Sequence, residues 1–581
     1  MFELKITGGT IVDGTGRAAF EGDVAIADGR IAAVGDLRGQ AADRTIDAAG
    51  AHVLPGFVDI HTHYDGQATW DVDLLPSSLL GVTTCVMGSC GVGFAPVKKG
   101  EEQRLVELME GVEDIPGAAL AEGIPWGWES VGDYLDFLAK DPRAIDVLVQ
   151  VPHDPVRMYV MGERAVAGER ATDDDIEAMR RVVRAALEAG AAGFSTGRSD
   201  NHRTAKGAET PASECDLREL VGIARAFEGL RHGVVQAVSD FDMARGPDRF
   251  DGELALLVAM AEAAGRPMSI STMQRDAEPG QWKRIFAGVE AATARGLDLR
   301  CQVAARGIGV LLGLEATFHP FMGFPTYKSL AALPLPERVA MLRRPEVRAA
   351  ILAEKTDKLA GDGTPIPPLA DVLLANIEKV AMRMFPLGAR PDYEPKLMDC
   401  IAGRAARTGG SVLAAIYDAL LEEEGKALLY FPIYNYASMN LDTVREMLVH
   451  PRALVGLGDA GAHVGTVCDA SMPAFLVQHW GPRLGLPRVV RMQTHDTARF
   501  IGLHDRGTLE VGMRADLNVI ELPRLTLQRP ELVRDLPAGG KRLFQRAEGF
   551  LATLVGGAVI AEQGALTGVR PGRLVRMGGA S

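Results

Sequence analysis

The middle of the chain alternates between apolar, strand-like runs that end in polar residues and longer, helix-like runs. GFVDIHTHYD, DVLVQVPHD and ALVGLGDAGAH are three of the strand-like runs, and DDDIEAMRRVVRAALEAG is a helix-like one. Strands that alternate with helices form a parallel sheet, because parallel neighbours need a crossover connection. About seven or eight such strands predict an α/β fold, a (β/α)8 TIM-like barrel, in which polar strand ends face the active site.

The two ends of the chain have a different texture, with short alternating strands joined by Gly and Asp turns. Residues 1–55 and 501–581 are therefore predicted to form one small β-sandwich, and residues 56–500 the catalytic barrel. Residues 306–440 contain many Pro and Lys residues and break the alternation. We expect an insertion there that covers the barrel mouth.

The composition, 47% hydrophobic and 24% charged, is that of a globular enzyme. A formal net charge of −14 argues against a nucleic acid or an anionic membrane as partner. The N-terminus lacks a signal-peptide pattern, no apolar run reaches about 18 residues, and the six cysteines show no paired spacing. We expect a cytoplasmic protein with a small-molecule substrate and no membrane partner, and leave a homo-oligomer open.

His61 and His63 lie at the end of the apolar run LPGFVDIHTHYD. Side chains two positions apart on a strand point to the same face, so both imidazoles can bind one ion. Imidazole nitrogens bind zinc at about 2.0–2.1 Å. The alternative, two chance histidines at a strand end, fits the Pro-Gly turn and the apolar context poorly. The pair therefore predicts a metal site.

Asp459, in ALVGLGDAGAH, ends an apolar strand one barrel-length after the histidines. A carboxylate there can bind a metal and accept a proton from bound water, although Asp-Ala-Gly is also a common turn. Cys90, in GVTTCVMGSCGVG, lies at a Gly-rich strand exit. A thiolate is a metal ligand, but buried cysteines beside glycine are common, so residue type alone leaves its role open.

The chain resembles the amidohydrolase superfamily, and within it the N-acyl-D-amino-acid deacylases (D-aminoacylases). The resemblance spans nearly the whole chain and is weakest between residues 306 and 440. It is carried by TGGTIVDGTG, LPGFVDIHTHYD, GVTTCVMGSCGVGFAPV, RMYVMGERAVAGERAT, AAGFSTG, GLGDAGAHVG and DRGTLEVGMRADLNVIEL. It implies a distorted (β/α)8 barrel with a small β-sandwich, zinc, and hydrolysis of an amide C–N bond. The metal ligands that it implies are His61, His63, Cys90 and Asp459.

The sequence departs from the family at the ends of strands five and six, where the family normally has a histidine. The matching stretches GVVQAVSDFD and PMSISTMQRD place Ala237 and Thr272 there, and no lysine is offered for a carbamate bridge. We therefore expect one zinc ion and a lost second site. Other histidines could take over, although hydrogen-bonding or substrate roles suit them better. These candidates are His153, His202, His232 and His463.

Arginines at predicted strand ends can hold an acid group of a substrate, because a guanidinium pairs with a carboxylate through two hydrogen bonds. A structural ion pair is the alternative for each of them. Gln274 falls where the resembling deacylases offer a basic residue to the substrate carboxylate, which weakens the case for a plain N-acyl amino acid. The predicted substrate-binding residues are Arg198, His202, Arg203, Gln274, Arg306 and His463.

The working hypothesis is hydrolysis of a linear amide by water that zinc activates. Zinc lowers the pKa of bound water to about 7, and Asp459 accepts the proton and passes it to the leaving nitrogen. Two alternatives stay open. The same ligands can serve a cyclic imide, lactone, carbamate or urea-type substrate, and a relative without the second metal could bind a metabolite without catalysis.

Overall fold

The computed structural model describes residues 1–241, 249–361, 366 and 368–578. At its centre is an eight-stranded parallel sheet that curls into a TIM-like barrel, with its strands in chain order. The predicted α/β barrel is confirmed. The strands are β6 (Phe57–Asp59), β7 (Val82–Met87), β8 (Asp146–Pro152), β9 (Gly193–Arg198), β10 (Val234–Ser239), β11 (Met268–Ser271), β12 (Leu299–Val303) and β16 (Ala453–Val455).

The first and last barrel strands meet just beyond their carboxyl ends. Thr62, after β6, forms an isolated parallel bridge with Ala460, after β16. The His63 main-chain N–H donates to the Ala460 carbonyl oxygen at 2.8 Å, and the Asp459 N–H donates to the His61 carbonyl oxygen at 3.2 Å. Main-chain hydrogen bonds therefore join the segments that carry the predicted metal ligands.

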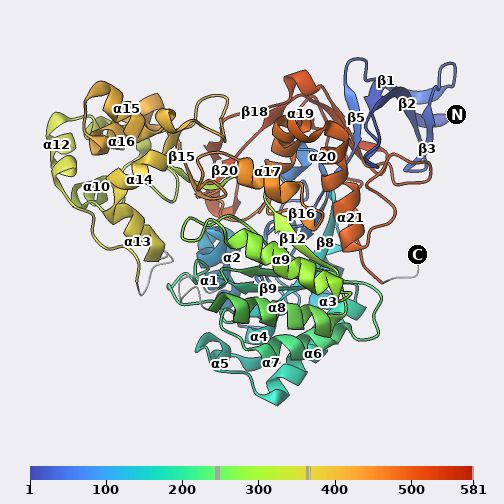
Figure 1. Ribbon diagram of the computed structural model, residues 1–581, viewed down its shortest axis with the longest axis horizontal. Helices are drawn as coiled ribbons and strands as arrows, with labels where there is room; N and C mark the ends of the chain where they lie inside the picture. Colours follow the sequence, from blue (N-terminus) through green and yellow to red (C-terminus); the bar gives the residue numbers. More distant parts are fainter. Residues whose placement is uncertain (242–248, 362–365, 367, 579–581) are drawn as a thin grey trace.

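Helices cover the outside of the sheet, and Figure 1 shows α8 and α9 lying across it. The longest of them, α6 (Asp173–Glu188), begins at a capping box of Thr172 and Asp175 and buries Met179 and Val183. Further helices in this layer are α3 (Val131–Leu138), α4 (His153–Met161), α7 (Leu217–Ala224), α8 (Phe250–Ala264), α9 (Gln281–Ala294), α20 (Leu486–Gln493) and α21 (His495–Ile501). None of the helices in the described part of the chain is both long and apolar enough to cross a membrane.

Strands from both ends of the chain pair in one nine-stranded sheet. β5 joins the two contributions, because it pairs with β1 on one side and with β17 on the other. The unit boundaries at residues 55 and 501 stay predictions. The strands are β1 (Phe2–Ile11), β2 (Phe20–Ala27), β3 (Arg30–Gly35), β4 (Ala42–Asp47), β5 (His52–Pro55), β17 (Leu517–Ile520), β22 (Phe550–Val555), β23 (Ala558–Glu562) and β24 (Ala565–Leu566).

Most of the segment between β12 and β16, from β13 to β15, forms a lobe of its own, drawn in yellow and orange at the left of Figure 1. We call it the insertion lobe. Its hydrophobic core includes Phe321, Ile416 and Tyr417 and is separate from the barrel core. Its strands are β13 (Ile308–Leu312), β14 (Phe385–Pro386) and β15 (Leu429–Tyr434), and its helices include α10 (Pro325–Leu330), α11 (Leu335–Leu342), α12 (Pro345–Ala353), α13 (Pro368–Ala375), α14 (Ile377–Val380), α15 (Ile401–Thr408) and α16 (Val412–Leu420).

Candidate metal centre

Four side chains from the ends of β6, β7 and β16 meet at the barrel mouth. His61 Nε2 lies 3.2 Å from Cys90 Sγ and 3.1 Å from Asp459 Oδ1. His63 Nε2 lies 3.7 Å from the same carboxylate oxygen. The ligand atoms of His61, His63 and Cys90 lie within 4.8 Å of one another, and all three residues are buried. This geometry can hold one ion.

Two of these residues occupy left-handed backbone, which is uncommon for residues with a Cβ atom. The φ angles are +54° at Cys90 and +43° at Asp459. Such conformations cost about 1–3 kcal/mol each and are concentrated at functional sites. The main-chain N–H of Cys90 donates to Gln236 Oε1 at 2.9 Å. At Gly91 a Cβ would lie 2.6 Å from the Gly197 nitrogen, so only glycine fits beside Cys90.

Acceptor oxygens face the Nδ1 atoms of both imidazoles. His61 Nδ1 lies 2.6 Å from Gln302 Oε1. An amide oxygen only accepts, so Nδ1 carries a proton and Nε2 is the nitrogen that can bind an ion. His63 Nδ1 lies 3.1 Å from Glu113 Oε1, an ion-pair distance without hydrogen-bond geometry, and this nearby carboxylate favours a proton on Nδ1. Both Nε2 atoms are therefore available at the centre of the cluster.

In this cluster, neighbouring charges shift the pKa values of the side chains in the direction opposite to the shift caused by burial. Burial lowers the pKa of His61, but Cys90 and Asp459 outweigh it and raise that pKa to about 10. Burial raises the pKa of Cys90 and of Asp459, but His61 and His63 outweigh it and lower both pKa values. The cluster thus pairs two anionic groups with two imidazoles, and a bound cation could replace the imidazolium protons as the counter-charge.

The donor set fits a zinc-like divalent ion. Two imidazoles, a thiolate and a carboxylate are the ligand types that zinc takes in four-coordinate sites. The cluster opens into a cavity of about 310 Å³. Among the described residues that line this cavity there is no lysine or arginine whose charge would compete with a metal ion.

The ends of β10 and β11 present Val238 and Met273 to this cavity, whereas Ala237 and Thr272 do not line it. Successive residues of a strand point to opposite faces. The positions aligned with the family's histidines, Ala237 and Thr272, are therefore each one residue away from the position that faces the cavity. Valine offers no ligand atom, and a thioether is a soft ligand that suits copper(I) better than zinc. These two strand ends are therefore poor supports for a second zinc ion.

Two of the predicted substrate-binding residues, His202 and His463, line the cavity. His463 Nε2 lies 3.7 Å from Glu113 Oε2, so the carboxylate that faces His63 also faces His463. Burial lowers the pKa of His202, which favours its neutral form. Neutral imidazole can donate or accept a hydrogen bond to an amide.

The other four predicted substrate residues do not line the cavity and are bound elsewhere in the protein. Arg198 Nε lies 2.6 Å from Glu253 Oε1, and Arg306 Nη2 donates to Asp469 Oδ1 at 3.1 Å. These two arginines therefore form structural ion pairs, which is the alternative to binding an acid group of a substrate. The four residues are Arg198, Arg203, Gln274 and Arg306.

Gln274 and Arg203 hold main chain near the cavity. The Gln274 amide nitrogen donates to Thr443 Oγ1 at 3.1 Å, and its oxygen accepts from the Ala437 N–H at 3.1 Å. Arg203 Nε donates to the Asp200 carbonyl oxygen at 3.0 Å. These contacts brace the segment after β15 and the loop after β9.

Glu113 and Gln302 are functional candidates that sequence analysis missed. Gln302 is a polar residue within the apolar strand β12, and that position was a usable signal. Glu113 ends α1 (Glu102–Glu113), a helix with several other glutamates, so nothing local distinguished it. Only the tertiary structure shows that it faces His63.

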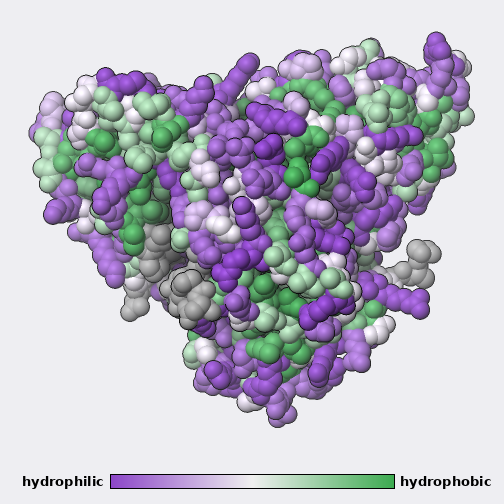
Figure 2. Space-filling model, viewed as in Figure 1, coloured by the Kyte–Doolittle hydropathy of each residue, from purple (hydrophilic) through white to green (hydrophobic). Residues whose placement is uncertain are grey.

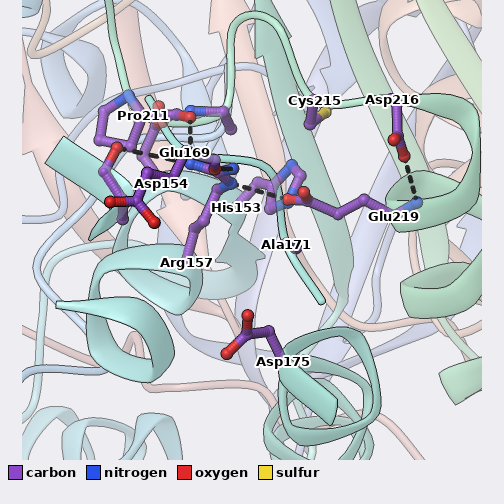
Figure 3. Close-up of polar contacts among 12 residues, drawn as sticks. His153, Asp154, Arg157, Glu169, Ala171, Asp175, Pro211, Cys215, Asp216 and Glu219 are labelled. Atoms are coloured by element: carbon purple, nitrogen blue, oxygen red, sulfur yellow. Dashed lines mark hydrogen bonds and ion pairs between the residues drawn. The ribbon is translucent and has the colours of Figure 1, made fainter. Parts of the chain in front are cut away.

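A second group of potential ligands lies on the helical side of the barrel (Figure 3). The ligand atoms of His153, Cys215 and Glu219 also lie within 4.8 Å of one another. His153 Nδ1 lies 2.9 Å from Thr196 Oγ1, and its Nε2 lies 3.1 Å from Glu219 Oε1. Arg157 Nε donates to the same oxygen of Glu219 at 2.9 Å. An arginine already supplies the positive charge, so this group is an internal network.

Comparison with known proteins gives the family. Residues 44–561 match the model described as Amidohydrolase family. This span covers most of the chain, and the chain therefore belongs to the amidohydrolase family.

Proteins similar to this chain include deacylases of Alcaligenes xylosoxydans xylosoxydans. The D-aminoacylase is 27% identical, covering 99% of this chain and 97% of the relative. The N-acyl-D-glutamate deacylase is 28% identical, covering 99% and 96%. Among solved structures, an N-acyl-D-glutamate deacylase from Bordetella bronchiseptica, complexed with zinc and a phosphonate inhibitor, has a TM-score of 0.63 and 24% identity over 99% of both chains. At that identity the structural likeness shows the fold alone.

Proposed function

We propose that this chain is a zinc-dependent deacylase, similar to N-acyl-D-amino-acid deacylases, that hydrolyses the C–N bond of linear amides. The observation that carries the proposal is the orientation of His61 and His63. Their Nδ1 atoms face Gln302 and Glu113, which leaves both Nε2 atoms for an ion. The names of the two Alcaligenes relatives, a D-aminoacylase and an N-acyl-D-glutamate deacylase, support amide hydrolysis.

The proposal includes a single ion, held by His61, His63, Cys90 and Asp459. Val238 and Met273 at the ends of strands five and six support this number, because they offer no hard ligand atoms. Zinc bound there would lower the pKa of a water molecule and polarise an amide carbonyl.

Asp459 is the proposed general base and general acid. Its carboxylate lies beside His61 and keeps 15% of its side-chain surface exposed, so it can reach a water molecule in the cavity. It would accept the proton of the attacking water and return it to the leaving nitrogen. His202 and His463 border the same cavity and can hydrogen-bond the amide.

The test is Asp459→Ala, assayed with zinc-loaded protein against N-acyl-D-amino acids, N-acyl-L-amino acids and simple N-acyl amines. Loss of proton transfer should lower turnover by about 10²–10⁴-fold. The exposed Asp442→Asn is the matched control and should hydrolyse the same substrates at the wild-type rate. Undiminished turnover by Asp459→Ala, or no hydrolysis by the wild-type protein, would overturn the proposal.

A further inference from the structure

We propose that the substrate is an uncharged amide with a long aliphatic group and without a carboxylate beside the scissile bond. This inference rests on the proposed amide hydrolysis and concerns the kind of amide that the cavity accepts. Two features of the cavity carry it, an apolar wall supplied by the insertion lobe and an excess of acidic side chains at the metal end.

The apolar wall comes from helices and strands of the insertion lobe. α13 and α14 contribute Leu373, Leu374 and Ile377, and Val380 follows on α14. Figure 2 shows hydrophobic residues gathered on this part of the lobe around α13. Other apolar lining residues from the lobe include Val310, Leu312, Phe318, Met384, Phe431 and Ile433.

The wall is continuous with the core of the insertion lobe. Leu374 and Ile377 belong to that core, and Val310 and Leu373 pack against it while staying partly exposed. Apolar surface that faces a cavity gains about 25 cal/mol for each Å² that a ligand covers. A bound aliphatic chain therefore gains free energy along this wall, whereas a short acyl group leaves the wall in contact with water.

Apart from histidines, the charged side chains among the described residues that line the cavity are all acidic. These acids are Glu110, Glu113, Asp114, Asp240 and Asp459. Burial lowers the pKa of His202 and lowers that of His319 to about 3, so neither histidine supplies a positive charge near neutral pH. A substrate carboxylate placed here would be desolvated beside like charges.

Cations near this end are already bound to other groups. Arg275 lies 3.8 Å from Asp240, but it donates to the Ser239 carbonyl oxygen at 2.7 Å and to Gln281 Oε1 at 2.9 Å. It does not line the cavity. Arg198 is likewise held by its ion pair with a glutamate. Because one ion would be neutralised by the thiolate and carboxylate that hold it, the metal adds little attraction for an anion.

The experiment compares two substrates that differ only in the carboxylate, N-decanoyl-D-leucine and N-decanoyl-3-methylbutylamine. Release of the amine is measured with zinc-loaded full-length protein. We expect kcat/KM for the carboxylate-free amide to be higher by at least about tenfold, because it avoids burying an unpaired charge. The N-acetyl analogue of the amine should be poorer than the decanoyl compound by at least about tenfold, because it covers less of the apolar wall.

Leu373→Asn tests the wall directly, and Val372→Asn on the same helix is the matched control because Val372 is 57% exposed and does not line the cavity. Leu373→Asn should lower kcat/KM for the decanoyl substrate much more than for the acetyl substrate, so that most of the chain-length preference is lost. Val372→Asn should keep the wild-type kcat/KM for both substrates.

Equal or faster hydrolysis of N-decanoyl-D-leucine would overturn this inference and leave the proposed function intact. So would an unchanged chain-length preference in Leu373→Asn. Failure to hydrolyse every amide tested would overturn the proposed function, and this inference with it.

Discussion

The two clusters of histidine, cysteine and acid in this chain contain similar ligand types at similar distances, yet their surroundings differ. In the cluster at the barrel mouth, the Nδ1 atoms of His61 and His63 face Gln302 and Glu113, and their Nε2 atoms face a thiol and a carboxylate. In the second cluster, both ring nitrogens of His153 are within hydrogen-bond distance of protein oxygens, and Arg157 binds the same glutamate.

The difference shows that ligand atoms within reach of one another do not by themselves define a metal site. Two features together distinguish the barrel-mouth cluster. Its potential ligand atoms point toward one another, and no described arginine or lysine lines the cavity beside them. In the second cluster Arg157 fills the place of a cation. It also donates to the Pro211 carbonyl oxygen at 2.8 Å and to that of Glu169, and so holds the loop before α7 and the loop before α6.

The largest loss of stability is expected from Arg157→Met, which tests whether Arg157 takes the place of a metal ion in the second cluster. The substitution leaves Glu219 buried without its arginine, and breaking a buried pair from one side costs about 3–5 kcal/mol. The free energy of unfolding, measured by urea titration, should fall by that amount while the zinc content of the folded protein stays unchanged. Arg164→Met, which removes half-exposed ion pairs with Glu169 and Asp175, is the control and should cost about 0–1 kcal/mol. A loss of bound zinc in Arg157→Met would contradict the assignment of the second cluster as an internal network without metal.

A smaller effect is expected from Asp154→Asn, beside the second cluster. Burial raises the pKa of Asp154 to about 7, and Oδ2 has no hydrogen-bond partner while Oδ1 accepts from the Ala212 N–H. The folded protein then holds this proton more tightly than the unfolded chain. Its contribution to stability is present at low pH and is lost as the pH rises from about 4 to about 7.

Asp154→Asn should therefore become more stable relative to wild type between pH 5 and pH 8, by on the order of 2–4 kcal/mol. Urea titrations of both proteins at the two pH values measure this difference. The exposed Asp141→Asn is the control and should track the wild type at both pH values. A relative stability of Asp154→Asn that does not change with pH would contradict the argument.

The barrel and its family could be predicted from the sequence, and both are confirmed. The alternation of strands and helices fixes the order of the barrel strands, and polar residues at the strand ends marked His61, His63 and Asp459. The structure brings these three together through main-chain hydrogen bonds between the first and last strands. Residue type alone did not decide whether Cys90 binds metal, and the family resemblance supplied the prediction that it is a ligand.

The rest depended on tertiary structure. Ala237 was expected to face the site, but strand register turns Val238 toward the cavity instead, and a shift of one residue is enough to exchange the faces. Glu113 comes from a helix between the second and third barrel strands, so local sequence could not pair it with His63. The predicted role of Arg306 as a substrate residue depended on a free guanidinium, and Asp469 binds that group.

The most direct test is the zinc content of the folded chain after saturation with zinc and removal of unbound metal. We predict about one ion per chain in the wild-type protein and in Cys215→Ser, and almost none in the double variant His61→Ala with His63→Ala. About two ions in the wild type would contradict the proposal of a single ion. One ion retained by the double variant would contradict the assignment of the metal site to the barrel mouth.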